Sequence, residues 1–211
     1  MANPTAAMLV IGDEILSGRT RDANMYHLAG RLTAHGIDLA EVRVVGDDAD
    51  TIVTALNALR ARYDTVFTSG GIGPTHDDIT ADCVAQAFGV GIDIREDARQ
   101  ILASNYPEGA AALNPARLRM ARIPDGAALI DNPVSKAPGF TIGNVHVMAG
   151  VPAVFKAMVE SILPTLTGGA PLLSESVRID KGEGDIAGPL GRIAADYPDV
   201  CLLYTSDAAD D

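Results

Sequence analysis

The chain has 211 residues, enough for one large domain or for one domain and a fragment of another. Apolar residues make up 47% and charged residues 21%, which excludes an intrinsically disordered chain, and a net charge of −12 without a basic stripe disfavours nucleic acid as a partner. No apolar run approaches the ~18 residues of a membrane span and only two cysteines are present, so we expect a cytoplasmic protein that neither enters the membrane nor depends on disulfides.

Six short apolar runs are predicted to form buried strands. They cover residues 6–11, 39–45, 65–68, 127–130, 140–142 and 145–148. Segments with helical periodicity separate the first three runs. This alternation is typical of an α/β fold in which helices cover a mostly parallel sheet.

The first predicted helix has Met25, Leu28 and Leu32 on its apolar face, a cap at Asp22, and an end at Gly36. Further helices are predicted around residues 52–59, from 80 to 88, near 96–106 and over 155–162. A strand, a loop and a helix therefore recur three times before residue 90. Right-handed crossovers should lay these three strands parallel, with their loops at one edge of the sheet.

A second, incomplete unit is predicted after the Gly- and Pro-containing segment 167–171. Residues 1–168 form the main domain. Residues 169–200 contain one predicted strand, at 176–179, and one helix, which is too little for an independent core. Residues 201–211 show no periodicity and are interpreted as a tail foreign to the natural protein, which would then continue past residue 200.

Acidic residues follow each of the first three strands. They are Asp13 and Glu14, then Asp47 and Asp48, then Asp77 and Asp78. Because the carboxyl ends of parallel strands meet at one edge, six carboxylates are expected there. Like charges this close favour a divalent cation among them, and carboxylate oxygens suit Mg²⁺, Mn²⁺, Co²⁺ or Ca²⁺. The alternative is that single acids only cap helices, as Asp22, Asp48 or Asp78 could.

The glycine-rich segment SGGIGPTHDD, residues 69–78, is the sharper signal. Glycines let backbone N–H groups approach an anion closely, and the helix that begins near Thr80 adds the positive end of its dipole. The segment therefore predicts a phosphate-bearing ligand, although it could also be a plain tight turn. It is neither a G-x-G-x-x-G fingerprint nor a P-loop. The predicted ligand contacts in the first and third loops are Gly12, Asp13, Glu14, Ser17, Gly18, Ser69, Gly70, Gly71, Gly73, Pro74 and Thr75.

Other polar residues near these loops could also reach the ligand. Asn24 could contact a sugar or a pterin edge, and Arg19 and Arg21 could meet a phosphate, unless this segment is only a solvated helix start. His76 could donate a proton to a leaving phosphate. No Ser or Cys nucleophile signature is present, which leaves metal-assisted chemistry at phosphorus.

Five segments, in order along residues 5–166, resemble the molybdopterin-binding domain of the MoaB/MogA family and are closest to its branch in CinA. The segments are GDEILSG (12–18), VGDD (45–48), SGGIGPTHDDIT (69–80), NPVSKAPGF (132–140) and AGVPAVFKAMVE (149–160). The five together are far more specific than any one motif.

The resemblance implies a three-layer α/β/α sandwich, a homo-oligomer (dimer or trimer), and a pocket for molybdopterin or an adenylated, diphosphate-linked ligand. In MogA-like members the chemistry is Mg²⁺-dependent adenylyl transfer to molybdopterin, and two critical acidic positions match Asp47 and Asp78 here. CinA-branch members are associated with metal-dependent cleavage of ADP-ribose and related nucleotide diphosphates. We expect a divalent ion, with K⁺ as a candidate second cation.

Catalysis is thus assigned to Asp47 and Asp78, and metal binding to Asp47, Asp78 and Asp13. Residues 169–200 resemble the start of the KH-like α+β subdomain that follows in the CinA branch. The alternative function is a module that binds molybdopterin without turning it over.

Overall fold

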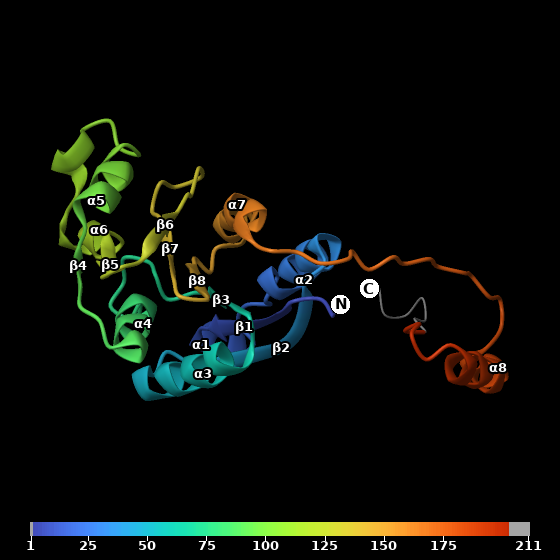
Figure 1. Ribbon diagram of the computed structural model, residues 1–211. Coiled ribbons are helices and arrows are strands. Elements are labelled where there is room, and N and C mark those ends of the chain that lie inside the picture. The colour runs from blue at the N-terminus through green and yellow to red at the C-terminus, as the bar shows by residue number, and fades with distance from the viewer. Residues whose placement is uncertain (1, 203–211) are drawn as a thin grey trace. The chain divides into compact units, whose positions relative to one another are not determined.

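The computed structural model describes residues 2–202 (Figure 1). Contacts between Cα atoms separate two compact units, Met1–Leu172 and Leu173–Asp211. The first unit holds the sheets and the helices packed on them. Within the described residues, no helix combines the length and the apolar character that crossing a bilayer requires.

A six-stranded sheet forms the centre of the first unit, and all six predicted strands are present. The strands are β1 (Thr5–Ile11), β2 (Asp38–Val45), β3 (Thr65–Ser69), β6 (Ala128–Ile130), β7 (Gly139–Ile142) and β8 (Val145–Met148), in the order β2-β1-β3-β8-β7-β6. The first four in this order are parallel, and β7 is antiparallel to both of its neighbours. Val10 lies opposite Val44 and Ser69, and Ser69 lies opposite Met148, so the carboxyl ends of four strands meet at one edge.

Helices cover both faces of this sheet. Helices α2 (Asn24–His35) and α7 (Pro152–Ile162) pack on one face, and α3 (Ala49–Arg62) and α4 (Thr80–Phe88) pack on the other (Figure 1). Successive residues of β1 alternate between the two cores, with Met8 on the α2–α7 side and Leu9 on the α3–α4 side. The three-layer α/β/α architecture is confirmed.

Two glycines end helices where the sequence predicts. Gly36 ends α2 and Gly89 ends α4, both in the left-handed conformation, with φ of 73° and 66°. The carboxylate of Asp22 accepts a hydrogen bond from the N–H of Met25 at 2.8 Å, as a cap would. The prediction that Met25 lies on the buried face is wrong, because Met25 is 41% exposed and the polar Asn24 is buried in its place.

A small lobe between α4 and β6 contains elements that the sequence does not reveal. Its elements are β4 (Ile92–Ile94), α5 (Glu96–Ala103), the 3₁₀ helix η1 (Gly109–Ala112), α6 (Pro115–Arg119) and β5 (Arg122–Pro124). Strand β4 pairs with β5 in antiparallel orientation, and only α5 matches a predicted helix. The short elements α1 (Asp13–Leu16) and η2 (Leu163–Thr165) are also new. Helices of one turn are too short to leave a hydrophobic period, and β4 and β5 form no apolar run, because they contain the charged residues Asp93 and Arg122.

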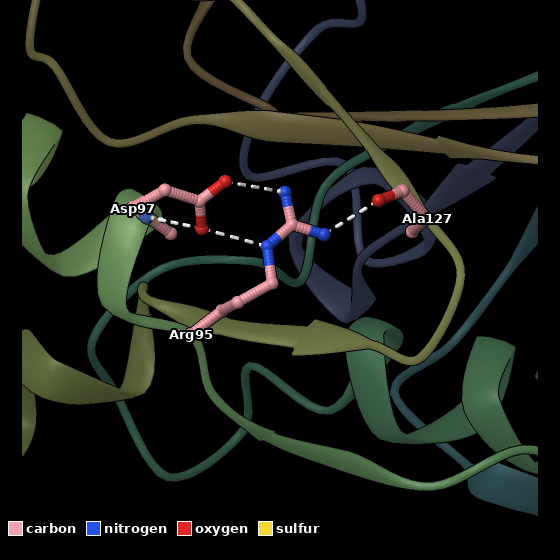
Figure 2. Close-up of polar contacts among 4 residues, drawn as sticks. Arg95, Asp97 and Ala127 are labelled. Atoms are coloured by element: carbon pink, nitrogen blue, oxygen red, sulfur yellow. Dashed lines mark hydrogen bonds and ion pairs between the residues drawn. The ribbon is translucent and has the colours of Figure 1, made fainter.

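Arg95 attaches this lobe to the main sheet (Figure 2). Its guanidinium donates to the carboxylate of Asp97 at 2.7 and 3.0 Å and to the carbonyl of Ala127, beside β6, at 2.5 Å. The N–H of Arg95 also donates to the carbonyl of Ala121 at 3.0 Å, next to β5. One residue therefore joins α5, β5 and the approach to β6.

The second unit contains α8 (Glu183–Asp196), which confirms the late predicted helix. Residues 176–179 form no strand, and that prediction is wrong, since the described residues of this unit supply no second strand to pair with. Residues 203–211, most of the predicted foreign tail, lie outside the described residues. The boundaries predicted at 168 and 200 stay predictions.

Helix α4 places Cys83 in the core, where it is 2% exposed. Burial raises the pKa of its thiol to about 11, so the reactive thiolate is scarce at pH 8. We expect a thiol reagent at pH 8 to label the exposed Cys201 about a hundredfold faster than Cys83 in the native protein, and both alike in urea. Mass spectrometry of the labelled peptides checks this. Equal native rates would contradict the packing of α4.

Candidate functional site

Four loops meet at the carboxyl edge of the parallel strands, after β1, β2, β3 and β8. The N–H of Gly12 donates to the carbonyl of Val45 at 3.0 Å, which joins the first loop to the end of β2. The N–H of Gly70 donates to the carbonyl of Met148 at 3.1 Å, which joins the third loop to the end of β8. The edge predicted from the β-loop-α repeats is therefore formed.

Acidic side chains from the first and third loops act on Asp47, which lies in the second. Its carboxylate accepts a hydrogen bond from the N–H of Asp13 at 3.0 Å. Burial raises the pKa of Asp47, the N–H of Asp13 opposes this shift, and the nearby carboxylates of Asp13, Glu14 and Asp77 raise the pKa further. Four of the six acids predicted at this edge thus interact electrostatically.

The other two acids are engaged within the fold. The carboxylate of Asp48 caps α3 by accepting from the N–H of Thr51 at 2.9 Å, as the capping alternative expects. The carboxylate of Asp78 accepts from the N–H of Thr75 at 2.8 Å and from the Thr75 hydroxyl. The catalytic roles of Asp47 and Asp78 stay predictions.

The acidic edge offers a pair of carboxylates to a cation. Among residues 2–202, no group of three or more His, Cys, Asp or Glu side chains is placed to hold a metal ion. In phosphate sites, Mg²⁺ is held by one or two carboxylates together with phosphate oxygens and water. Asp47 and Asp13 match this donor set, so these residues fit a hard divalent ion that binds with a phosphate ligand.

The glycine-rich loop approaches the main chain too closely for any side chain at two positions. Gly70 has φ 108°, and a Cβ there would lie 2.2 Å from the carbonyl oxygen of Ile11. Gly71 has φ 69°, and a Cβ there would lie 2.0 Å from Oγ1 of Thr80. Conformation and space both require glycine. The loop is thereby seated on β1 and on the start of α4.

Consecutive backbone N–H groups of this loop are free. Within the part of the chain that the structure describes, the N–H groups of Gly71, Ile72 and Gly73 have no hydrogen-bond acceptor. Successive free N–H groups in a turn that contains a left-handed residue form an anion-binding concavity. The loop therefore has the donors that a phosphate needs.

The remaining predicted ligand contacts divide by exposure. Pro74 and Thr75 are exposed in the third loop, and Ser17 and Gly18 are exposed after α1. Ser69 is 2% exposed and makes an internal hydrogen bond. Of these five residues, Ser69 alone cannot contact a ligand without movement of the chain.

The predicted cations differ in their contacts. Nε of Arg19 donates to the Ser17 hydroxyl at 3.2 Å, and His76 is 99% exposed with Nδ1 3.8 Å from the Asp77 carboxylate. Arg21 lines a separate hollow between α2 and α7. The sequence alone does not show which cation serves the glycine-rich loop.

Arg119, which sequence reasoning missed, lies beside that loop. It lines a narrow hollow with Gly73 and Asp78, and its Nη2 donates to the Asp78 carbonyl at 3.0 Å. Its Nε is buried without a hydrogen-bond partner, and no carboxylate lies within 4.0 Å of the guanidinium in residues 2–202. Arg122, in contrast, is paired with Asp82 at 2.6 Å. The sequence signal that could have indicated Arg119 is the presence of three arginines between residues 117 and 122 of an acidic chain.

The loop before β7 contains most of the segment NPVSKAPGF (132–140), to which the sequence analysis assigned no site residue. Nδ2 of Asn132 donates to the Ser135 hydroxyl at 2.7 Å and to the Ala137 carbonyl at 2.8 Å. Lys136 has φ 58°, and no other non-glycine residue in the described ranges has a positive φ. Such strained positions cluster at functional sites.

Asn24 links two of the loops from inside. Its Nδ2 donates to the Ser69 hydroxyl and to the Gly150 carbonyl, each at 2.8 Å. We expect Asn24→Ala to lower the free energy of unfolding by about 1–3 kcal/mol, because both buried acceptors lose their donor. Urea unfolding followed by circular dichroism measures this. An unchanged midpoint would show that the bridge is dispensable.

Comparison with known proteins agrees with this geometry. Residues 7–168 match the family described as "Probable molybdopterin binding domain". The chain is 40% identical over 167 residues to a CinA-like protein of Citrifermentans bemidjiense, covering 77% of this chain and 40% of that protein. It is 39% identical to a protein of Thermoplasma acidophilum, covering 75% of this chain and 64% of the relative. The chain thus spans less than half the length of the CinA-like relative.

Solved structures agree as well. The crystal structure of CinA from Thermoplasma acidophilum, described as of unknown function, superposes with a TM-score of 0.71 at 37% identity over 77% of this chain and 97% of that one. MoaB of Thermus thermophilus, at 16% identity and a TM-score of 0.51 over 77% of this chain and 91% of that chain, shows the shared fold. The chain belongs to the MoaB/MogA-type molybdopterin-binding domain family, in the group related to CinA.

Proposed function

We propose that this chain binds a diphosphate-linked nucleotide or pterin at the glycine-rich edge and acts on the phosphoanhydride of that ligand with Mg²⁺, Mn²⁺ or Co²⁺. The observation that carries the proposal is the run of free N–H groups at Gly71, Ile72 and Gly73, beside the acidic pair of Asp13 and Asp47. The N–H groups bind phosphate and the carboxylates bind the cation.

Charge explains why both features belong to one site. Asp13, Glu14 and Asp47 would repel a phosphate, and a divalent ion between them removes that repulsion. Such an ion supplies charge stabilisation at phosphorus when bound. The chain's own residues hold the ligand through the loop N–H groups and through the guanidinium of Arg119, which has no carboxylate partner among the described residues.

The reaction class follows from the phosphoanhydride bond of the proposed ligand. In hydrolysis, water adds to one phosphorus, the bridging P–O bond breaks, and the bridging oxygen leaves on the second phosphate. ADP-ribose would give AMP and ribose 5-phosphate. In adenylyl transfer, a phosphate of the pterin replaces water and diphosphate leaves from ATP. Asp47 would hold the ion or polarise the attacking group in either case.

A non-catalytic binding module is the second candidate. It is favoured by the carboxylate of Asp78, which is bonded to Thr75 within its own loop. Several structural neighbours carry molybdopterin biosynthesis in their names, including MoaB of Thermus thermophilus, and this supports a pterin as the ligand to try.

Phosphorus NMR of the full chain with ADP-ribose tests the proposal, with Mg²⁺ or Co²⁺ and K⁺ supplied. We expect AMP and ribose 5-phosphate to appear, and EDTA to stop their appearance. Binding of ADP-ribose or molybdopterin without product over hours would replace the enzyme by the binding module. Neither binding nor product would contradict both candidates.

Replacing Arg119 with glutamine should raise KM for ADP-ribose about tenfold and change kcat little, because a charge-assisted hydrogen bond to phosphate is lost. Arg117→Gln is the matched control on the same helix. Its guanidinium lies 4.3 Å from the Tyr106 ring centre and donates to the Ala112 carbonyl at 2.6 Å. Steady-state kinetics of both variants measure this. If the two variants have equal KM values for ADP-ribose, Arg119 does not contact the ligand.

A further inference from the structure

A second hollow in the first unit is lined by none of the residues of the glycine-rich loop. It opens between the start of α2 and α7, has a volume of about 570 Å³, and is lined by Arg21, Asp22, Ala23, Tyr26, His27 and Lys156. Small-molecule sites usually have volumes of about 300–1,000 Å³. The hollow beside Arg119 has about 10 Å³, room for about one water molecule. The α2–α7 hollow therefore has room for a small-molecule ligand.

Uncompensated positive charge marks this α2–α7 hollow. Within residues 2–202, neither Arg21 nor Lys156 has a carboxylate within 4.0 Å. Asp22 contributes the one lining carboxylate, which accepts a hydrogen bond from the N–H of Met25 and offsets only one of the two positive charges. Glu160 lies nearby but is held by Arg31 at 2.6 Å. Two free cations at one place in a chain of net charge −12 indicate an anionic occupant.

Two further groups give the hollow its chemical character. The side chain of Tyr26 is 85% exposed, which leaves its ring free to stack on a flat group. Nε2 of His27 is buried and has no hydrogen-bond partner in the described residues. Desolvation and then Lys156 lower the pKa of His27, so its ring adds no positive charge to the hollow at neutral pH.

We propose that the α2–α7 hollow is a second ligand site, which binds a flat aromatic group that carries phosphate, such as a nucleoside monophosphate. Arg21 and Lys156 meet the phosphate, and Tyr26 stacks on the base. None of these residues belongs to the glycine-rich loop, whose N–H groups bind the diphosphate in the proposed reaction, and Arg21 lies in the segment between α1 and α2. The second site is therefore lined by other side chains than those that bind the diphosphate.

AMP is the probe, since it carries a base and a phosphate but no anhydride to cleave. Calorimetric titrations of the full chain in EDTA and about 150 mM salt compare three proteins, at an ionic strength that screens distant surface charge. Arg21→Gln with Lys156→Gln removes both cations from the hollow. Lys181→Gln with Arg192→Gln removes the same two charges from the second unit. We expect AMP to bind at least about tenfold more weakly to the first double variant and unchanged to the second.

Tyr26→Leu separates stacking from charge. It should weaken AMP binding about fivefold or more and leave ribose 5-phosphate binding unchanged, because only AMP has a base to stack. All the substituted side chains are exposed, so the fold is retained, and circular dichroism verifies it. Equal AMP affinity in all proteins, equal loss in both double variants, or no AMP binding by the parent would each overturn the proposal. Turnover of ADP-ribose is measured separately and does not affect these outcomes.

Discussion

Asp47→Asn is expected to lower the turnover of ADP-ribose by about a hundredfold or more and to leave the fold intact. Asparagine keeps an oxygen that can accept the hydrogen bond from the Asp13 N–H but carries no charge for a cation. Phosphorus NMR at matched protein concentration measures the rate. A variant that turns over at the parent rate would show that Asp47 has no part in the chemistry.

Stability should change in the opposite direction from activity. Burial and neighbouring carboxylates raise the pKa of Asp47 above its value in the unfolded chain, so its charged form destabilises the fold at pH 7. This destabilisation disappears as the pH falls through the raised pKa of Asp47, because the carboxylate becomes protonated. We therefore expect Asp47→Asn to be at least as stable as the parent at pH 7, with the difference shrinking toward pH 4. Asp78→Asn should instead lose stability, since Asp78 anchors Thr75.

Gly70→Ala is expected to be the most damaging single-methyl change in the site. The new Cβ would lie 2.2 Å from the Ile11 carbonyl at a φ of 108°. We expect the free energy of unfolding to fall by more than about 2 kcal/mol, and ligand binding to be lost because the loop must move off β1.

Gly89→Ala is the matched control, since Gly89 has φ 66° but no atom within 4 Å of the added Cβ. It should lower the free energy of unfolding by about 1 kcal/mol, because alanine is unfavourable in the left-handed conformation but meets no other atom there. Urea unfolding of both variants separates the effect of the left-handed conformation from the effect of the contact with the Ile11 carbonyl. Equal losses in the two variants would mean that the approach of Gly70 to β1 is not needed.

The centre of the sheet was predictable because β1, β3 and β8 are short runs that are buried on both faces, whereas β2 is partly exposed. The runs at 6–11 and 65–68 have the pattern of strands in a parallel sheet, and this pattern is enough to identify them. Gly36 and Gly89 were predictable as helix ends because glycine readily adopts the left-handed conformation there. The meeting of the loops at one edge followed from the handedness of β-loop-α units.

Contacts between distant residues decide what the sequence could not predict. Strands β4 and β5 are three residues each and exist only as a pair. Asn24 is buried because Ser69 and Gly150, far along the chain, accept its hydrogen bonds. The predicted strand at 176–179 fails for the converse reason, since the described part of its unit gives it no partner.

The same distinction holds within the site. The acidic and glycine-rich loops are contiguous motifs and were predicted. Arg119 comes 41 residues after Asp78, whose carbonyl it contacts, and no local pattern connects the two. Which carboxylates stay available to a ligand also depends on the fold, since Asp48 and Asp78 are engaged by Thr51 and Thr75.

The most direct measurement is an amide NMR titration of the full chain with ADP-ribose and Mg²⁺. If the diphosphate binds to the free N–H groups of the glycine-rich loop, the amide resonances of Gly71, Ile72 and Gly73 will shift together and saturate with the ligand. If these three resonances stay unchanged at saturating ligand while other amides shift, the glycine-rich edge is not the diphosphate site.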